Sequence, residues 1–375
     1  MNIWQTEKES LTEDEILGFI NKYQSEVVPK LDKLWEYYIG HNTKILKRGK
    51  AQDANNPDNR VPVPYGRKII TTYSGYAFRP RFITYKSIDV QQKETEVKGI
   101  VEKVKGFFKK PEDSKNVDDY YKVIQDNFSL NKEHIKTNRA GRNTAIFGMA
   151  YELVFVDSAV EMSDGKPTAK NTPKFVSIDP REMILFYDFS IEPQKKIAIR
   201  FFKTEGNDGR VEVYYNDHYE KYIWTAKSEE NEEKLTRDGD DITNFFGKIP
   251  VVTYYFGDEM NGLIDPVLSL IDAYDVLVSD SLNEFDRFAF SYLIMKKFGL
   301  TDQAKKQSGE MVEQAAKTLK KKRIFEHLPE GADIKFLTKD IPYEFIKFMT
   351  DLLREQIHIQ SHVPDFTSDK MAGAS

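Results

Sequence analysis

The chain has 375 residues, of which 40% are hydrophobic and 31% charged, so it is long enough for two or more domains. Its formal net charge of −5 argues against a protein that simply coats DNA, although a local basic patch stays compatible with it. The absence of cysteine excludes disulfides and thiol chemistry, and no apolar stretch approaches the ~20 residues that cross a bilayer.

The first part of the chain has helical periodicity. Ser10 and Glu13 have the spacing of a capping box, for a helix over 10–38 that Pro29 divides and Gly40 ends. An extended piece is predicted at 81–85 and a polar loop at 49–60. Further helices are predicted over 65–78, 94–109, 116–128 and 130–147.

The pattern then changes to short runs rich in β-branched and aromatic residues, separated by turn signals such as Asp164-Gly165. These runs predict a mostly antiparallel sheet embedded between helical segments, which is an α+β fold. The predicted strands are 151–157, 174–178, 183–187, 196–203, 210–215 and 220–225.

The longest helical pattern follows a β-like run from Ile249 to Phe256. Apolar residues recur at three- and four-residue steps, and nothing between Pro266 and Gly299 is expected to break this helix. At 1.5 Å per residue it would span about 45 Å. Its polar face is acidic, with only Arg287 to offset it. The acidic residues are Asp272, Asp275, Asp280, Glu284 and Asp286.

The next segment, 296–323, reverses the charge and has a net charge of +6. A solvated helix face would explain it, and so would contact with phosphates or with an acidic partner. A β-like piece at 334–337, a last helix over 342–360 and a polar tail follow. The basic residues are Lys296, Lys297, Lys305, Lys306, Lys317, Lys320, Lys321, Lys322 and Arg323.

Few residues suggest catalysis. There is no phosphate-binding loop of the G-x-x-x-x-G-K-[ST] type, and the six histidines are scattered. His358 and His362 share a helix spacing, but without a nearby carboxylate a solvated helix end is the better interpretation than a metal site. Asp118-Asp119 and Asp240-Asp241 would need a third carboxylate to hold Mg²⁺. The sequence therefore predicts neither an active site nor a cofactor.

Seven segments, taken together and in order, resemble tailed-bacteriophage portal proteins of the long-tailed siphophage type. The segment that carries most of the resemblance is IPVVTYYFGDEMNGLIDPVLSLIDAYDVLVSDSLNEFDRFAF. The others are LDKLWEYYIGHNTKIL, NNPDNRVPVPYGRKIITTYSGYAF, AIFGMAYELVFVDS, VSIDPREMILFYD, VEVYYNDHYEKYIW and HVPDFTSDKMAGAS.

This resemblance implies a portal fold with an α/β wing, long stem helices and a small α/β clip. The wing would be 1–255, helical to about 148 and β-rich from 149 to 255. The stem helix would be 256–295, the clip 296–341, the second stem helix 342–360, and the start of the tunnel loop 361–375. The clip would present the basic residues to DNA or a partner, and the acidic face would be a channel wall or an intersubunit contact. The tunnel-loop candidates are Asp365, Ser368 and Lys370.

The resemblance also implies a function in the virion. The chain would form a ring, usually of twelve subunits, at one capsid vertex, assembled in the host bacterial cytoplasm. Double-stranded DNA would pass through it during packaging and ejection. Its protein partners would be the terminase large subunit, a head–tail connector protein, and the capsid and scaffolding proteins, with no membrane. The alternatives are a metal-dependent nucleic-acid enzyme and another minor virion structural protein.

The chain departs from the family pattern at two places. Residues 78–83, FRPRFI, lack the glycine that the family carries after the second helix of this region. The chain also ends at Ser375, inside the loop motif, where family members continue into a crown domain. We therefore expect no crown domain in this chain, either because it is shortened or because the protein has none.

Overall fold

The computed structural model divides the chain into two compact units. The first comprises Met1–Asn42, Pro64–Ser269 and Ile357–Ser375, and the second comprises Thr43–Val63 and Leu270–Gln356. Residues 43–63 are thus grouped with most of the long helix and not with the rest of the N-terminal part. The residues described are 4–49, 57–78, 113–163, 166–204, 208–225, 233–289, 292–296, 333–337 and 342–367.

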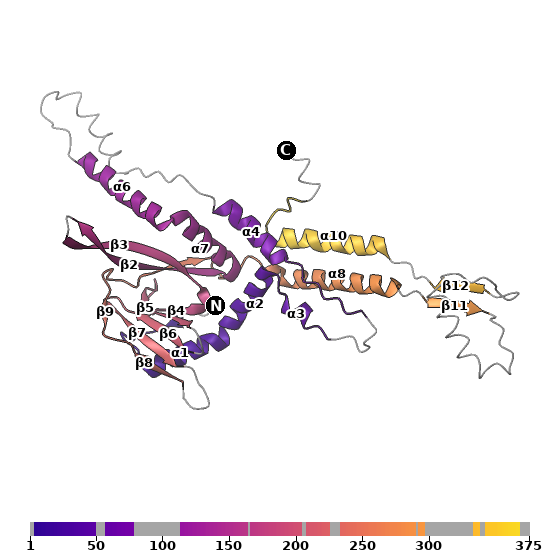
Figure 1. Cartoon of the computed structure of the whole chain (residues 1–375), viewed down its shortest axis with the longest axis horizontal. Coiled ribbons are helices and arrows are strands. Elements are labelled where there is room, and N and C mark those ends of the chain that lie inside the picture. The colour runs from indigo at the N-terminus through magenta and orange to yellow at the C-terminus, as the bar shows by residue number, and fades with distance from the viewer. Residues whose placement is uncertain are drawn as a thin grey trace, which may run out of the picture. The chain divides into compact units, whose positions relative to one another are not determined.

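A seven-stranded sheet forms much of the first unit (Figure 1). Its order is β1-β4-β5-β6-β7-β8, with β9 beside β7, and every pair is antiparallel except β1 with β4. Buried and half-buried residues alternate along β6, as on a strand with one covered face. The strands are β1 (Trp4–Gln5), β4 (Met183–Tyr187), β5 (Lys195–Lys203), β6 (Gly209–Tyr214), β7 (His218–Thr225), β8 (Lys234–Arg237) and β9 (Ile242–Thr243).

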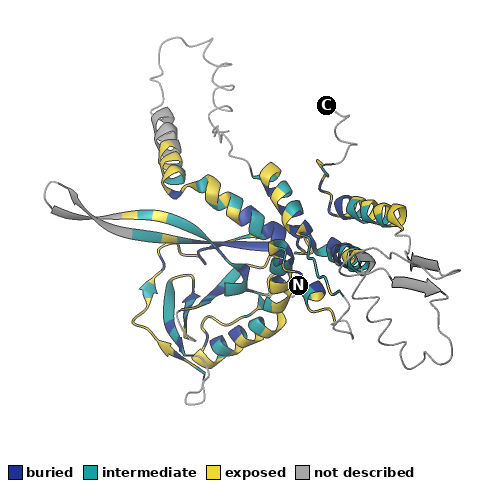
Figure 2. Ribbon diagram, turned by 45° about the vertical axis from the view of Figure 1, so that its right-hand side comes forward, coloured by how far each residue is buried: buried dark blue, intermediate teal, exposed yellow. Residues whose placement is uncertain are grey.

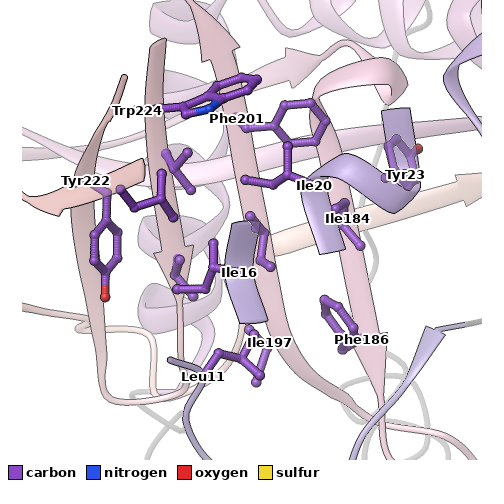
Figure 3. Packing of buried hydrophobic residues seen from close by; sticks show 14 of the residues in the cluster. Leu11, Ile16, Ile20, Tyr23, Ile184, Phe186, Ile197, Phe201, Tyr222 and Trp224 are labelled. Atoms are coloured by element: carbon purple, nitrogen blue, oxygen red, sulfur yellow. The ribbon is translucent and has the colours of Figure 1, made fainter. Parts of the chain in front are cut away.

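Helix α1 (Glu13–Glu26) packs on this sheet through one apolar stripe (Figure 3). Ile16, Ile20 and Tyr23 are buried in one cluster with Ile197 and Phe201 of β5. These positions recur every three or four residues, so all three side chains leave the helix on the same side.

The predicted capping box of this helix is wrong by two residues. The cap is Thr12, whose hydroxyl accepts the Glu15 N–H at 3.4 Å, while the Glu15 carboxylate accepts the Thr12 N–H at 3.1 Å. Thr12-x-x-Glu15 has the same pattern as Ser10-x-x-Glu13, and only the helix start decides between them.

A second sheet has the order β10-β2-β3, so the prediction of one sheet is wrong. β10 (Val251–Tyr255) pairs with the first residues of β2 (Met149–Ser163), and β2 pairs from Tyr151 to its end with β3 (Lys166–Ile178). Alternation identifies a strand but not its partner, which is why the sequence could not separate the sheets. Figure 2 shows that the buried residues among the described part of this hairpin lie at its base.

Four more helices of the first unit lie near the predicted positions. They are α2 (Val28–Ile39), α4 (Tyr65–Ala77), α6 (Asp113–Asn131) and α7 (Glu133–Phe147). Gly40 ends α2 in the left-handed region with φ of 78°, as the sequence predicts. Lys132, at φ 50°, separates α6 from α7. Two short 3₁₀ turns, Pro180–Glu182 and Asp265–Val267, precede β4 and the long helix.

The second unit contains α3 (Thr43–Leu46), most of α8 (Leu268–Ala289), the hairpin pair β11 (Tyr292–Lys296) and β12 (Asp333–Leu337), and most of α10 (Tyr343–Gln360). The prediction that nothing breaks this helix before Gly299 is therefore wrong, because Tyr292–Lys296 is a strand. At 22 residues α8 spans about 33 Å. A short apolar run such as Tyr292–Lys296 fits both the helical and the strand repeat, and its pairing with β12 makes it a strand.

Several predictions fall on residues outside the described ranges. They are the extended piece at 81–85, the helix over 94–109, and most of the basic segment. None of the described helices is both long enough and apolar enough to span a membrane.

Candidate functional site

Side chains on α8 hold an irregular segment, 57–63, through its backbone. The Asp275 carboxylate accepts the Val63 N–H at 2.9 Å, and the Ser279 hydroxyl accepts the Val61 N–H at 3.0 Å. The Asn283 side-chain oxygen accepts the Asn59 N–H at 2.6 Å. The helix thus satisfies three backbone donors at alternate positions of this segment.

The spacing of these contacts follows from the two repeat lengths. Four residues of helix advance about 6 Å, and two residues of extended chain advance about 6.6 Å, so every fourth side chain meets every second N–H. Asp275 and Ser279 are buried, and the Ser279 hydroxyl also donates to the Asp275 carbonyl at 2.7 Å. A buried carboxylate is stable only when it is hydrogen-bonded, so Asp275 is a structural anchor of this unit.

Three more acidic residues of α8, namely Asp272, Asp280 and Asp286, bind side chains between Lys44 and Asn59. Asp272 pairs with Lys44 at 2.8 Å, and Asp280 binds both terminal nitrogens of Arg48 at 2.7 and 3.2 Å. Asp286 accepts from the Asn59 side chain at 2.5 Å, and Glu284 is half-buried on the same helix. These partners were not predicted from the sequence, although Lys44 and Arg48 repeat at the four-residue spacing of a helix face.

A second cluster fixes the chain after α10, within the first unit. The His358 ring nitrogen Nδ1 lies 2.9 Å from the Val363 carbonyl, and both residues are buried. Lys68 of α4 binds the Asp365 carboxylate at 3.0 Å. The Phe366 ring stacks on Tyr76 of α4, with centroids 5.3 Å apart. The first residues of the predicted tunnel loop are therefore held on α4.

Asp365 is the polar centre of this cluster. Burial alone would raise the pKa of its carboxyl group, but hydrogen bonds from the Thr367 hydroxyl and from Lys68 outweigh burial and lower the pKa. The carboxylate also accepts the Thr367 N–H at 3.1 Å, which closes a tight turn. Ser368 and Lys370, the other two candidates in this loop, lie outside the described residues.

The structure changes the interpretation of the histidines and acidic pairs. His358 is buried, so the predicted solvated helix end is wrong for it. Among the described residues, His218, Glu220 and Asp241 place ligand atoms within 4.8 Å of one another. The Arg237 guanidinium already contacts Glu220 at 3.3 Å and hydrogen-bonds Asp241, so a cation of this chain occupies the position. The side chains of Asp118 and Asp119 are not among those described.

The basic segment has one described member. Lys296 is the last residue of β11 and lies opposite Asp333 in the register of the hairpin. Lys297 and the other basic candidates from Lys305 to Arg323 lie outside the described residues, so their role stays a prediction.

Comparison with protein families gives one result that spans the molecule. The family described as phage portal protein, SPP1 Gp6-like, matches residues 17–375. A comparison with individual curated proteins gives no match. The matched range contains the second unit, the first unit from residue 17 onward, the long helix and the cluster after α10. This chain belongs to the phage portal protein family.

Proposed function

We propose that the chain assembles into a ring at one capsid vertex and forms the channel through which double-stranded DNA is packaged and ejected. The observation that carries this proposal is the family match over residues 17–375. The motor chemistry would belong to a separate terminase, which agrees with the missing phosphate-binding loop in the sequence. The ring would hold twelve copies, and the terminase large subunit and a connector protein would dock on it.

The parts of the ring are proposed from the order of elements. The wing would include the two sheets and helices before residue 255, and α8 and α10 would be the two stem helices. The clip would lie between them, at 296–341, and the tunnel loop would start after α10. The succession of helix α8, strand β11, strand β12 and helix α10 supports this order.

The contacts of α8 suggest two roles for its acidic residues. Asp275 is fully buried and binds the Val63 backbone, so its role is to hold the segment 57–63 in place. The Asp280 side chain remains 49% exposed beside Arg48, and it is a better candidate for the channel wall or a neighbouring subunit. Carboxylates on a channel wall would repel the DNA backbone and let it pass without adhesion.

The basic clip is proposed to dock the terminase and the connector. Replacing Lys320, Lys321 and Lys322 together by Glu should lower DNA packaging and connector attachment by about tenfold or more, because it reverses the charge of the docking surface. A tenfold loss requires a change of only ~1.4 kcal/mol in the free energy of docking. Packaged DNA and connector content of purified capsids measure the two effects. Charge reversal of the exposed Lys30, Lys33 and Lys203 is the control, expected to leave both unchanged. Unchanged packaging and attachment in the clip variant would overturn this assignment.

A further inference from the structure

The turn between β4 and β5 presents two apolar side chains to solvent. Phe189 is 60% exposed, and Ile191 is 103% exposed, so Ile191 touches almost nothing in its own chain. Both flank Ser190 in the turn 188–194, which we call the tip. Exposed large apolar side chains at a defined place on a surface are typical of interaction sites.

The tip is held in shape by hydrogen bonds. The Asp188 carboxylate accepts the Ser190 hydroxyl at 2.6 Å and the Gln194 N–H at 2.9 Å. The Ser190 hydroxyl also lies 2.7 Å from the Glu192 carbonyl. The Ser190 hydroxyl bond, followed by the Gln194 N–H, lowers the pKa of Asp188, so this carboxylate remains charged and bonded at neutral pH. Because the turn is preorganised, docking its side chains costs little conformational entropy.

An aromatic groove lies elsewhere on the same unit, with a volume of about 510 Å³. Phe155 and Val156 of β2 line one side, and the stacked rings of Tyr214 and Tyr219 lie in it. The loop after β9 adds Phe245, which is 81% exposed, and Phe246, which is 41% exposed. We call this cavity the groove.

The groove is as well fixed as the tip. The buried Asn244 side chain donates to the carbonyls of Tyr215 and Lys248, both at 2.8 Å, and accepts the Phe246 N–H at 3.1 Å. These bonds fix the backbone of the loop that carries Phe245 and Phe246, whose side chains stay exposed. β10 stops pairing with β2 where the Val154 N–H meets the Pro250 carbonyl at 2.8 Å. Val156 follows on the same edge of β2, so an added extended segment would continue the line of β10.

The topology places the tip and the groove at the same end of the seven-stranded sheet. β4 and β6 run in the same direction, so the turns that follow them share one end, and β9 pairs with the first residues of β7 there. The β4–β5 hairpin lies next to the β6–β7 hairpin in the sheet order. Their turns are therefore two strand positions apart, or about 10 Å. A copy displaced sideways would therefore bring a tip toward a groove.

We propose that the tip of one subunit seats in the groove of the next subunit of the ring. Phe189 and Ile191 would fill the aromatic cavity, and the backbone of the tip would lie along the edge of β2 at Val156. Rings are built from contacts between two unlike patches, and the tip and the groove are a protruding and a hollow patch of matching apolar character. The inference rests on the proposed function, because it requires the ring.

Cysteine crosslinking of the full chain tests this contact, since the natural sequence has no cysteine. The variants Ile191→Cys and Phe245→Cys replace exposed side chains, so both should fold. Treated with a short bis-maleimide, a mixed ring of the two single variants should give a covalent dimer. The double variant should give a series of covalent oligomers up to the number of subunits in the ring. The control replaces Ile191→Cys by Val123→Cys, a position 65% exposed on α6, and should give neither product.

The size of the assembly, measured by mass photometry before crosslinking, separates the two proposals. Rings that form without a tip-to-groove product, or with as much product from Val123→Cys, would overturn this contact and leave the ring intact. A chain that forms no ring at any concentration would contradict the proposed function and this contact together. Rings that crosslink only through the tip and groove would establish it.

Discussion

Gly148→Ala is expected to destabilise the first unit by about 3–5 kcal/mol, the sum of strain at a positive φ and an overpacked backbone contact. Gly148 joins α7 to β2 with φ of 78°, and an added Cβ would lie 2.1 Å from the Met260 carbonyl oxygen. The neighbouring atoms belong to the backbone, and the Phe256 N–H also donates to the Gly148 carbonyl at 2.9 Å. Neither the Met260 backbone nor the Gly148 backbone can move away without disturbing the connection between α7 and β2. The free energy of unfolding in urea measures the loss.

Gly239→Ala is the matched control for this substitution. Gly239 also has a positive φ, of 89°, but an added Cβ there meets no heavy atom within 4 Å. We therefore expect only the strain of the left-handed conformation, about 1 kcal/mol. Equal losses for the two variants would show that the close approach of Met260 does not contribute.

Asp275→Ala is expected to destabilise the second unit by about 2–3 kcal/mol, because it leaves the Val63 N–H unsatisfied near a buried helix face. The segment 57–63 should then separate from α8 more often, so trypsin should cleave after Arg60 faster than in the unchanged protein. Asp280→Ala is the control. Its pair with Arg48 is about half exposed, so its loss should cost about 0.5 kcal/mol. Unchanged cleavage at Arg60 in Asp275→Ala would contradict the anchoring role.

Much of the fold could be predicted from local patterns. The helical pattern on both sides of Pro29 and the stop at Gly40 depend on neighbouring residues alone, and the structure confirms both. The end of α8 could not be predicted, because Tyr292–Lys296 becomes a strand by pairing with residues about forty positions away. The division into two sheets could not be predicted either, because it depends on which distant strands pair.

The candidate site shows the same limit. The acidic stripe of α8 was visible as a pattern, but its partners lie more than 200 residues earlier in the chain, at Lys44, Arg48 and 59–63. The sequence suggested an exposed charged face, whereas Asp275 is buried. The tip and the groove could not be predicted from the sequence, because a lone Phe189 or Phe245 in a turn has no periodicity. Only their exposure in the folded chain identifies them.

Copies of this chain are proposed to close into a ring around a channel, and negative-stain electron microscopy of the purified full chain at high protein concentration tests this directly. We expect end-on views of a closed ring with an open centre and side views in which a narrower part projects from a wider one. Compact particles of monomer size at every concentration, without closed rings, would contradict it.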